Sequence, residues 1–567
     1  MIADMFADIS PGLLLIVGAI LVPFFPGKRR GVYVLALPVL AFVQLIGLEH
    51  GSFGNVTLFD VELTTLSVDR LSLIFGYIFL IATLLGMIYA LHVGDWMQHV
   101  AGLVYAGSAI GAVFAGDLVT LFLFWEGTAI SSVFLIWASR TERSMAAGTR
   151  YLVVQVGSGV LLLAGTMVHY GQTGSIAFNS LELESTAGLL IFLSFGIKCA
   201  FPFLHNWLQD AYPEATVTGT VMLSAFTTKL AVYSLARGFA GTEILVPIGA
   251  AMTAFPIFYA VIENDLRRVL SYSLNNQLGF MVVGIGIGTD LAVSGAAAHA
   301  FCHILYKALL FMSMGAVLFR TGTVKGSELG GLYKTMPWTT AFCIIGAASI
   351  SAFPLFSGFV SKSLIISAAL KGEYYWTWLI LLFASAGVFH HSGIKIPFFA
   401  FFAHDSGRRP PEAPLNMLVA MGIAAALCIG IGVFPGPLYA ILPYDVTYHA
   451  YTLEHVLTQL QLLIFSALAF TVLMRTGLYP PELRSTNLDS DWILRKPLPF
   501  LARWARDWGA LLRDSVVALG QSGFSSMIGA LSRHGGPEGA LARTRPTGFM
   551  ALWMTLLLLI FLVLSLF

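Results

Sequence analysis

The stretch AGLLIFLSFGIKCAFPFLH, residues 187–205, sets the fold expected for the whole chain. It is apolar over nearly the length that a helix needs to cross a membrane, about 20 residues. Yet it holds a lysine, Lys198, and a proline, Pro202. A proline frees a backbone carbonyl and breaks the helix, which a membrane tolerates only where the break faces protein or water. The stretch therefore predicts a broken membrane helix with a charged side chain inside the protein.

The composition extends this interpretation to the whole chain. Of its 567 residues, 57% are hydrophobic and 11% are charged, whereas about 25% are charged in soluble proteins. So few charges cannot cover a soluble surface, which excludes a cytosolic enzyme and any disordered or fibrous protein. The net charge of +1 argues against a nucleic-acid-binding protein, which has a basic face. We expect an all-α polytopic membrane protein with about 14 to 16 transmembrane helices.

The loops between the apolar stretches differ in charge. When the apolar stretches are numbered from the N-terminus, the loops that follow odd-numbered stretches are basic, as at residues 28–30, 140–150 and 408–409. Loops that leave even-numbered stretches carry only Arg70, Arg237 and Lys371. Because short basic loops stay on the cytoplasmic side, the pattern predicts an N-terminus that faces outward.

Lysines occur inside the predicted spans, where they are costly. They are Lys198, Lys229, Lys307, Lys362 and Lys395. Each costs about 2.5–3.5 kcal/mol at a helix centre, unless its long side chain reaches the headgroups. That alternative stays open for Lys362 and Lys395, whose span ends are unclear. A buried lysine is disfavoured in its charged form and favoured by a neighbouring carboxylate, so it can exchange a proton when its partner changes.

Two further groups of ionisable residues lie in the predicted spans. Glu126 lies well inside its span, which favours an ion pair with Lys198 over a role in capping the helix. His299, His303 and Lys307 recur every four residues and share one helix face. This stripe favours a proton relay, with buried structural histidines or a metal site as alternatives. A neighbouring ammonium disfavours the metal site.

A second broken helix is predicted at Pro354 and Gly358, five spans after the break at Pro202. Because five is odd, two five-span blocks cross in opposite senses, which is an inverted repeat whose broken helices mark the ion site. Lys229 and Lys395 correspond under the same offset. The predicted domains are N-terminal transmembrane helices in 1–97, five-helix repeats in 98–238 and 243–402, C-terminal transmembrane helices in 403–476, and an amphipathic surface segment with a final transmembrane helix in 477–567.

The sequence contains no cofactor motif. Its four cysteines are single and lie in apolar spans, without the C-x-x-C spacing of metal or redox sites. It also lacks a glycine-rich phosphate-binding loop. We therefore expect no cofactor, no metal and no catalytic residues, and a transporter subunit rather than an enzyme.

Motifs between residues 65 and 435 resemble one family, in order and at its spacing. They are Lys198 with Pro202, Trp207, Asp210 and Pro213; Leu223–Tyr233 around Lys229; Asp265–Tyr272; His299–His303 with Lys307; and Phe353–Phe359 with Lys362. The chain resembles the antiporter-like membrane subunits shared by Mrp-type sodium/proton antiporters, respiratory complex I and membrane-bound hydrogenases. Lysine at both Lys229 and Lys362 most resembles the D-type branch of the Mrp subunits.

In that family, ion-pair switching along a row of such residues moves protons across the membrane. The resemblance implies that Glu126 and Lys198 form the pair at one end, and that Lys362 exchanges protons with solvent at the other. Lys395 is additional to the family pattern and is either a second exit or a lysine that reaches the headgroups. The full set of residues expected to carry protons is Glu126, Lys198, Lys229, His299, His303, Lys307, Lys362 and Lys395.

We expect a proton-translocating subunit of a multisubunit sodium/proton antiporter, in a prokaryotic inner or plasma membrane. Its expected partners are other membrane subunits, protons, sodium and lipid, and not nucleic acid. One alternative is a proton-pumping subunit of a redox-driven complex of the NADH:quinone oxidoreductase or hydrogenase type. Another is a non-transporting scaffold, which gains nothing from charges inside the membrane.

Overall fold

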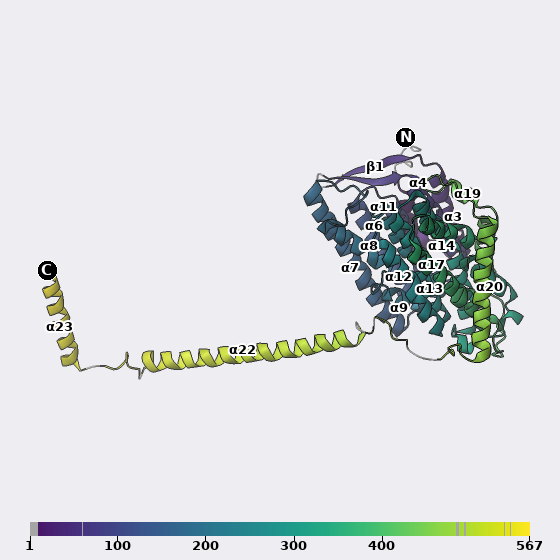
Figure 1. The fold of residues 1–567 in the computed structure, drawn as a ribbon. Coiled ribbons are helices and arrows are strands. Elements are labelled where there is room, and N and C mark those ends of the chain that lie inside the picture. The colour runs from purple at the N-terminus through teal and green to yellow at the C-terminus, as the bar shows by residue number, and fades with distance from the viewer. Residues whose placement is uncertain are drawn as a thin grey trace. The chain divides into compact units, whose positions relative to one another are not determined.

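Helices form most of the described chain (Figure 1). The computed structural model describes residues 9–58, 61–483, 487–490, 492, 495–537, 539–544 and 546–566. The chain divides into two units, Met1–Asn487 and Leu488–Phe567. Residues 1–8, which include the N-terminus whose orientation is predicted above, lie outside the described residues.

The first half of the larger unit contains eleven α-helices, two 3-10 turns and one hairpin among the described residues. They are α2 (Pro11–Leu21), η1 (Val22–Phe24), α3 (Lys28–Ile46), β1 (Gly51–Leu58), β2 (Val61–Val68), α4 (Arg70–Tyr89), α5 (Trp96–Val113), α6 (Leu118–Trp137), α7 (Glu142–Thr173), α8 (Thr186–Cys199), α9 (Asn206–Ala211), η2 (Tyr212–Glu214), α10 (Val217–Ala225), α11 (Thr227–Gly238) and α12 (Leu245–Ile262).

The second half of this unit continues with further helices. They are α13 (Leu266–Ile287), α14 (Asp290–Thr321), η3 (Gly326–Glu328), η4 (Leu332–Lys334), α15 (Pro337–Ile350), α16 (Ser357–Lys371), α17 (Tyr375–Val388), η5 (Phe389–Lys395), η6 (Phe398–Phe402), α18 (Leu415–Val433), α19 (Gly436–Ala440) and α20 (Leu453–Thr476). Both η5 and η6 are π-helical, so the membrane-length helix Tyr375–Phe402 changes its winding halfway.

Ten of the described helices are long and apolar enough to cross a membrane. Shorter apolar helices include α8 and α15, because each of them ends at a predicted break. The all-α polytopic fold expected from the sequence is therefore confirmed. The broken spans are divided into short helices, so they do not add to the membrane-length set.

The two predicted breaks share both sequence and backbone conformation. Ala-Phe-Pro-Phe at 200–203 separates α8 from α9, and Ala-Phe-Pro-Leu at 352–355 separates α15 from α16. The first and last residues of each break have positive φ, 62° and 67° in the first and 57° and 74° in the second. This left-handed conformation costs a non-glycine residue about 1–2 kcal/mol. The shared conformation supports a repeat, and the opposite sense of its two halves stays a prediction.

One element of the larger unit is not helical. Strands β1 and β2 form an antiparallel hairpin in which Gly51 lies opposite Val68. The Ser67 N–H donates to the Phe114 carbonyl at 2.7 Å, which joins the hairpin to the end of α5. Nothing in the apolar pattern of the chain predicts this hairpin, because it lies between two spans.

Helix α14 lies in the core of the larger unit. Its apolar window is 94% buried, and it packs against α4, α10, α13, α15, α16 and α18. The polar side chains between Ala292 and Val317 of α14 are buried, so they face protein rather than lipid. Nearby, α12 and α13 cross at Gly249 and Gly279, where a Cβ on either glycine would meet the backbone of the other helix. Such close approach is typical of helices packed in membranes.

The smaller unit contains α22 (Pro497–Gly535) and α23 (Thr547–Ser565). No described residue of either helix is buried within the chain. On α22 the exposed side chains include Leu501, Trp504 and Trp508, and α23 is long and apolar enough to cross a membrane. A surface position for α22 and a final span at α23 stay predictions.

Candidate functional site

Lys198 lies at the end of α8 and is fully buried against α6. Its Nζ donates to the Trp125 carbonyl at 2.6 Å and to Thr128 Oγ1 at 2.8 Å. It also lies 4.3 Å from the centre of the Trp125 ring. These contacts flank Glu126, whose charge reaches Lys198 over a longer distance. The direct ion pair expected from the sequence is therefore not formed within the described residues, and a carbonyl and a hydroxyl hold the ammonium instead.

Lys229 lies at a third break, which no proline marks. Helix α10 ends at Ala225 and α11 begins at Thr227, with Phe226 between them. The Lys229 Nζ is buried and donates to the Ser224 carbonyl at 2.6 Å, in the last turn of α10. The negative end of a helix dipole favours a cation, so this break provides a binding place for the ammonium.

Lys362 lies in α16, just after the break that contains Pro354. Its Nζ donates to the Ile350 carbonyl at 3.1 Å, at the end of α15, and lies 5.0 Å from the centre of the Phe280 ring. A Cβ on Gly358 would meet the Ser349 carbonyl. Glycine is therefore required for the close approach of α16 to the end of α15, which brings Lys362 to that carbonyl.

The predicted stripe on α14 is formed by fully buried side chains. His299 contacts Ser361 Oγ through Nδ1 at 3.1 Å and Gln277 Oε1 through Nε2 at 3.2 Å. The two imidazole rings of His299 and His303 lie 6.2 Å apart and are stacked. Neither ring nitrogen of His303 makes a hydrogen bond to the described residues. The Lys307 Nζ donates to Ser273 Oγ on α13 at 2.9 Å.

The structure gathers residues of three helices into one central cluster. Lys229, Lys307 and Lys362 all act electrostatically on His303. Lys229 and Lys362 also act on Lys307 and on His299. Glu126 and Lys198 form a separate group, whereas Cys199, next to Lys198, lies within electrostatic reach of Lys229. The ionisable residues predicted from the sequence thus follow one another through the core.

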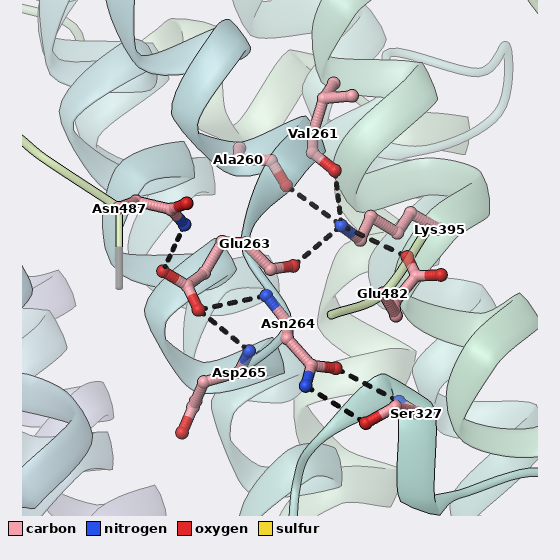
Figure 2. A network of polar contacts seen from close by, with 9 residues as sticks. All are labelled: Ala260, Val261, Glu263, Asn264, Asp265, Ser327, Lys395, Glu482 and Asn487. Atoms are coloured by element: carbon pink, nitrogen blue, oxygen red, sulfur yellow. Dashed lines mark hydrogen bonds and ion pairs between the residues drawn. The ribbon is translucent and has the colours of Figure 1, made fainter. Parts of the chain in front are cut away.

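Lys395 occupies a polar site of its own at the end of α12 (Figure 2). Its side chain is 1% exposed, and Nζ donates to the carbonyls of Ala260, Val261 and Glu263 at 3.3, 2.6 and 2.7 Å. It also forms an ion pair of 3.3 Å with Glu482, in the segment after α20. Lys395 is therefore buried in protein, and neither it nor Lys362 reaches a lipid headgroup.

Several residues of these sites have no signal in the sequence. Gln277 and Ser273 are neutral polar residues in apolar stretches, which a search for charges passes over. The same is true of Ser392, whose hydroxyl donates to Ser273 Oγ at 2.8 Å. His391 stands close to Lys395 in the sequence, and that proximity is the one signal that points to it. Glu482 follows the last helix of the larger unit, far along the chain from Lys395, so only the fold brings the two together.

The chain is similar in sequence to membrane subunits of known complexes. Residues 115–390 match the family model "NADH:quinone oxidoreductase/Mrp antiporter, TM". The A-type subunit of the Na(+)/H(+) antiporter of Alkalihalophilus pseudofirmus is 30% identical over 511 residues, which cover 78% of this chain and 62% of that protein. The D-type subunit from the same organism is 35% identical over 285 residues, 47% of this chain and 58% of that protein.

Hydrogenase-4 component B of Escherichia coli is 27% identical over 427 residues, 65% of this chain and 62% of that protein. The chain thus spans about three fifths of the length of the curated relatives it matches. Among solved structures, an Mrp complex from a Dietzia species contains a chain with a TM-score of 0.69 and 22% identity. An archaeal membrane-bound sulfane sulfur reductase contains one with a TM-score of 0.68 and 24% identity. Each match covers 78% of this chain and 96% of the other, which shows a shared fold.

Proposed function

We propose that the chain is the proton-translocating subunit of a multisubunit monovalent cation/proton antiporter, with sodium as the cation. The proposal starts from the match of residues 115–390 to the transmembrane family that NADH:quinone oxidoreductases and Mrp antiporters share. Relatives include both the A-type and the D-type subunits of such antiporters. The proposal therefore concerns the antiporter-like module rather than the D-type branch alone. We further propose a prokaryotic inner membrane, with the N-terminus outside.

The observation that carries the proposal is the way the buried lysines are held. Lys198, Lys229, Lys307 and Lys362 form no ion pair within 4 Å in the described part of the chain, and carbonyl or hydroxyl oxygens bind each ammonium. Charged groups inside a membrane are costly and mark ion pathways. An ammonium without a fixed counter-ion responds to any change in a neighbouring charge, which is what stepwise proton transfer requires.

The proposed path runs along the row in short steps. Glu126 controls the charge next to Lys198, and a proton then passes between Lys229 and the central group on α14. His299 and His303 relay it, because an imidazole can accept a proton on one nitrogen and release one from the other. Lys362 ends the row beside the break at Pro354. Since broken helices in a membrane face protein or water, this end is the natural place for exchange with water.

A redox-driven complex remains the second candidate, because the similarity to hydrogenase-4 component B extends over 65% of the chain. A non-transporting scaffold explains none of the buried ammonium groups. The complete assembly, in everted vesicles from a host without its own antiporters, separates the candidates. We expect sodium chloride, but not choline chloride, to collapse a respiration-driven pH gradient. Proton pumping on addition of an electron donor, without any response to sodium or potassium, would overturn the antiporter in favour of the redox-driven complex.

Gly159 offers a test of Glu126 that removes no ionisable group. Glu126 Oε1 is buried without a hydrogen bond to the described residues, and it occupies the space that a Cβ on Gly159 of α7 would need. Gly159→Ala therefore displaces the carboxylate. Because a misplacement of about 1 Å can cost roughly 100-fold in a positioned reaction, we expect sodium-dependent proton exchange in the same vesicles to fall about tenfold or more.

Gly157 provides the matched control, since it lies on the same helix and a Cβ added to it would stand in open space. Gly157→Ala should keep the wild-type rate. Equal rates for the wild type and both alanine variants would show that the position of the Glu126 carboxylate does not matter for exchange.

A further inference from the structure

A chain of hydrogen bonds leaves the central cluster at Lys307 and leads toward Lys395. The Lys307 Nζ donates to Ser273 Oγ at 2.9 Å, and the Ser392 hydroxyl donates to the same oxygen at 2.8 Å. His391 Nδ1 contacts Ser392 Oγ at 2.9 Å. All four side chains are fully buried, and they come from α14, α13 and η5. A buried serine pair between a lysine and a histidine can pass a proton when its hydroxyls reorient.

The π-helix η5 contains the next two residues of this series, His391 and Lys395. His391 and Lys395 are four residues apart within it, close to one turn, and π-helical turns recur at functional sites. Both Lys307 and Lys395 act electrostatically on His391, so this histidine lies between the central cluster and the polar site at the end of α12. His391 Nε2 is buried and makes no hydrogen bond to the described residues.

Lys395 and Glu482 end this series of polar contacts. The Glu482 side chain is 9% exposed, against 1% for Lys395, and it lies after α20, outside the spans. Figure 2 shows the Lys395 ammonium between the carbonyls at the end of α12 and this carboxylate. Burial raises the pKa of Glu482, and the charge of Lys395 opposes that rise. His404 and Tyr479 are the other titratable groups that interact with Glu482, whereas Glu263 acts on Lys395.

We propose a side branch of the proton path that leaves the central row at Lys307 and exchanges protons with water at Glu482. Its members, in order, are Lys307, Ser273, Ser392, His391, Lys395 and Glu482. In the outward step, the Lys395 ammonium gives one proton to the Glu482 carboxylate, which leaves a neutral amine and a neutral acid. Glu482 then releases that proton to water. Lys307 passes a proton through Ser273 and Ser392 to His391, and the resulting imidazolium gives one to the Lys395 amine, which becomes an ammonium again. The branch rests on the proposed function and adds to it a second place of exchange. This place acts in series with the one at Lys362, so that a proton taken up at one is released at the other.

The competing explanation is a structural latch, in which the ion pair only fastens the segment after α20. Buried ion pairs can often be replaced by apolar residues of similar size without loss of stability. The double variant Lys395→Met/Glu482→Leu should therefore keep the segment after α20 fastened, but its two side chains cannot carry a proton. In vesicles that contain the whole assembly, we expect this double variant, Glu482→Gln and Ser392→Ala to lower sodium-dependent exchange by similar factors, about tenfold.

The matched control is Asp405→Asn, which changes an acid to an amide in an exposed ion pair with Lys334. It should keep the wild-type rate. A double variant that exchanges at the wild-type rate, or a Ser392→Ala variant that does so, would overturn the branch. If the wild-type assembly itself showed no sodium-dependent exchange, that result would contradict the proposed function instead.

The pH dependence of exchange and the infrared spectrum should both change in Glu482→Gln if Glu482 carries protons. Neither should change in that way if the ion pair is only a structural latch. Ionised Glu482 accepts protons at a pH above its pKa, so exchange through the branch falls as the pH drops through that value. This acid limb should disappear in Glu482→Gln. Independently of transport, the purified assembly should show the C=O band of a protonated carboxyl that titrates with pH and is absent in Glu482→Gln. Identical spectra for the two proteins would overturn the role of Glu482.

Discussion

Replacing Lys362 by alanine is expected to lower sodium-dependent proton exchange by about 100-fold or more, which is the contribution of a well-positioned proton-transfer group. Lys362 ends the row of buried lysines, and its Nζ has the Ile350 carbonyl as its hydrogen-bond acceptor in the described residues. No other lysine of the row lies on α16 close enough to take its place. The initial rate of gradient collapse in everted vesicles, normalised to the amount of assembly, measures this loss.

The structural cost of Lys362→Ala is small by comparison. It leaves one buried carbonyl without its donor, which costs about 1–3 kcal/mol, so the assembly should still form. Lys371, exposed at the end of the same helix, provides the control, and Lys371→Ala should keep the wild-type rate. If both variants exchanged protons at equal rates, Lys362 would have no part in the path.

Replacing Lys198 by alanine is expected to have the second large effect, also about 100-fold. Lys198 stands next to Glu126, and the two charges interact although no direct ion pair joins them. If they act as one unit, their effects are not additive. Glu126→Gln should therefore be about as slow as Lys198→Ala, and the double variant should be no slower than either one.

The double-mutant cycle distinguishes a coupled pair from two independent roles. Residues that share no interaction have additive effects, so a double variant as slow as the product of the two single losses would contradict a coupled pair. The same vesicle assay and the same normalisation apply to all four proteins. Because every variant keeps Thr128, the hydroxyl that binds Lys198, differences between them report on the two charges.

Much of this architecture follows from the sequence because charges are scarce in it. Each lysine inside an apolar span stands out, and the structure buries Lys198, Lys229 and Lys307 as expected. It also buries Lys362 and Lys395, for which the sequence left the alternative of reaching the headgroups open. Prolines at two spans predicted the breaks, which share the Ala-Phe-Pro sequence and its backbone conformation. The four-residue spacing of His299, His303 and Lys307 placed them on one face, since helix geometry alone fixes that.

The remaining features depend on contacts that no local pattern encodes. The break at Phe226 contains no proline, so no residue type marks it in the sequence. The structure shows it as a change of backbone conformation between α10 and α11. The π-helix η5 has an apolar pattern that an α-helix fits equally well. The ion pair of Lys395 with Glu482 joins segments far apart in the chain. The expected ion pair of Glu126 with Lys198 was wrong in its geometry, because a carbonyl and a hydroxyl reach the ammonium first.

Protons are proposed to cross the membrane along the buried lysines of this chain. The most direct test is the initial rate of sodium-dependent collapse of a pH gradient in everted vesicles that contain the whole assembly, for the wild type and for the Lys198→Ala/Lys362→Ala double variant. We predict rapid collapse in the wild type and none above background in the double variant. Sodium-dependent collapse that survives both substitutions would contradict the proposed path.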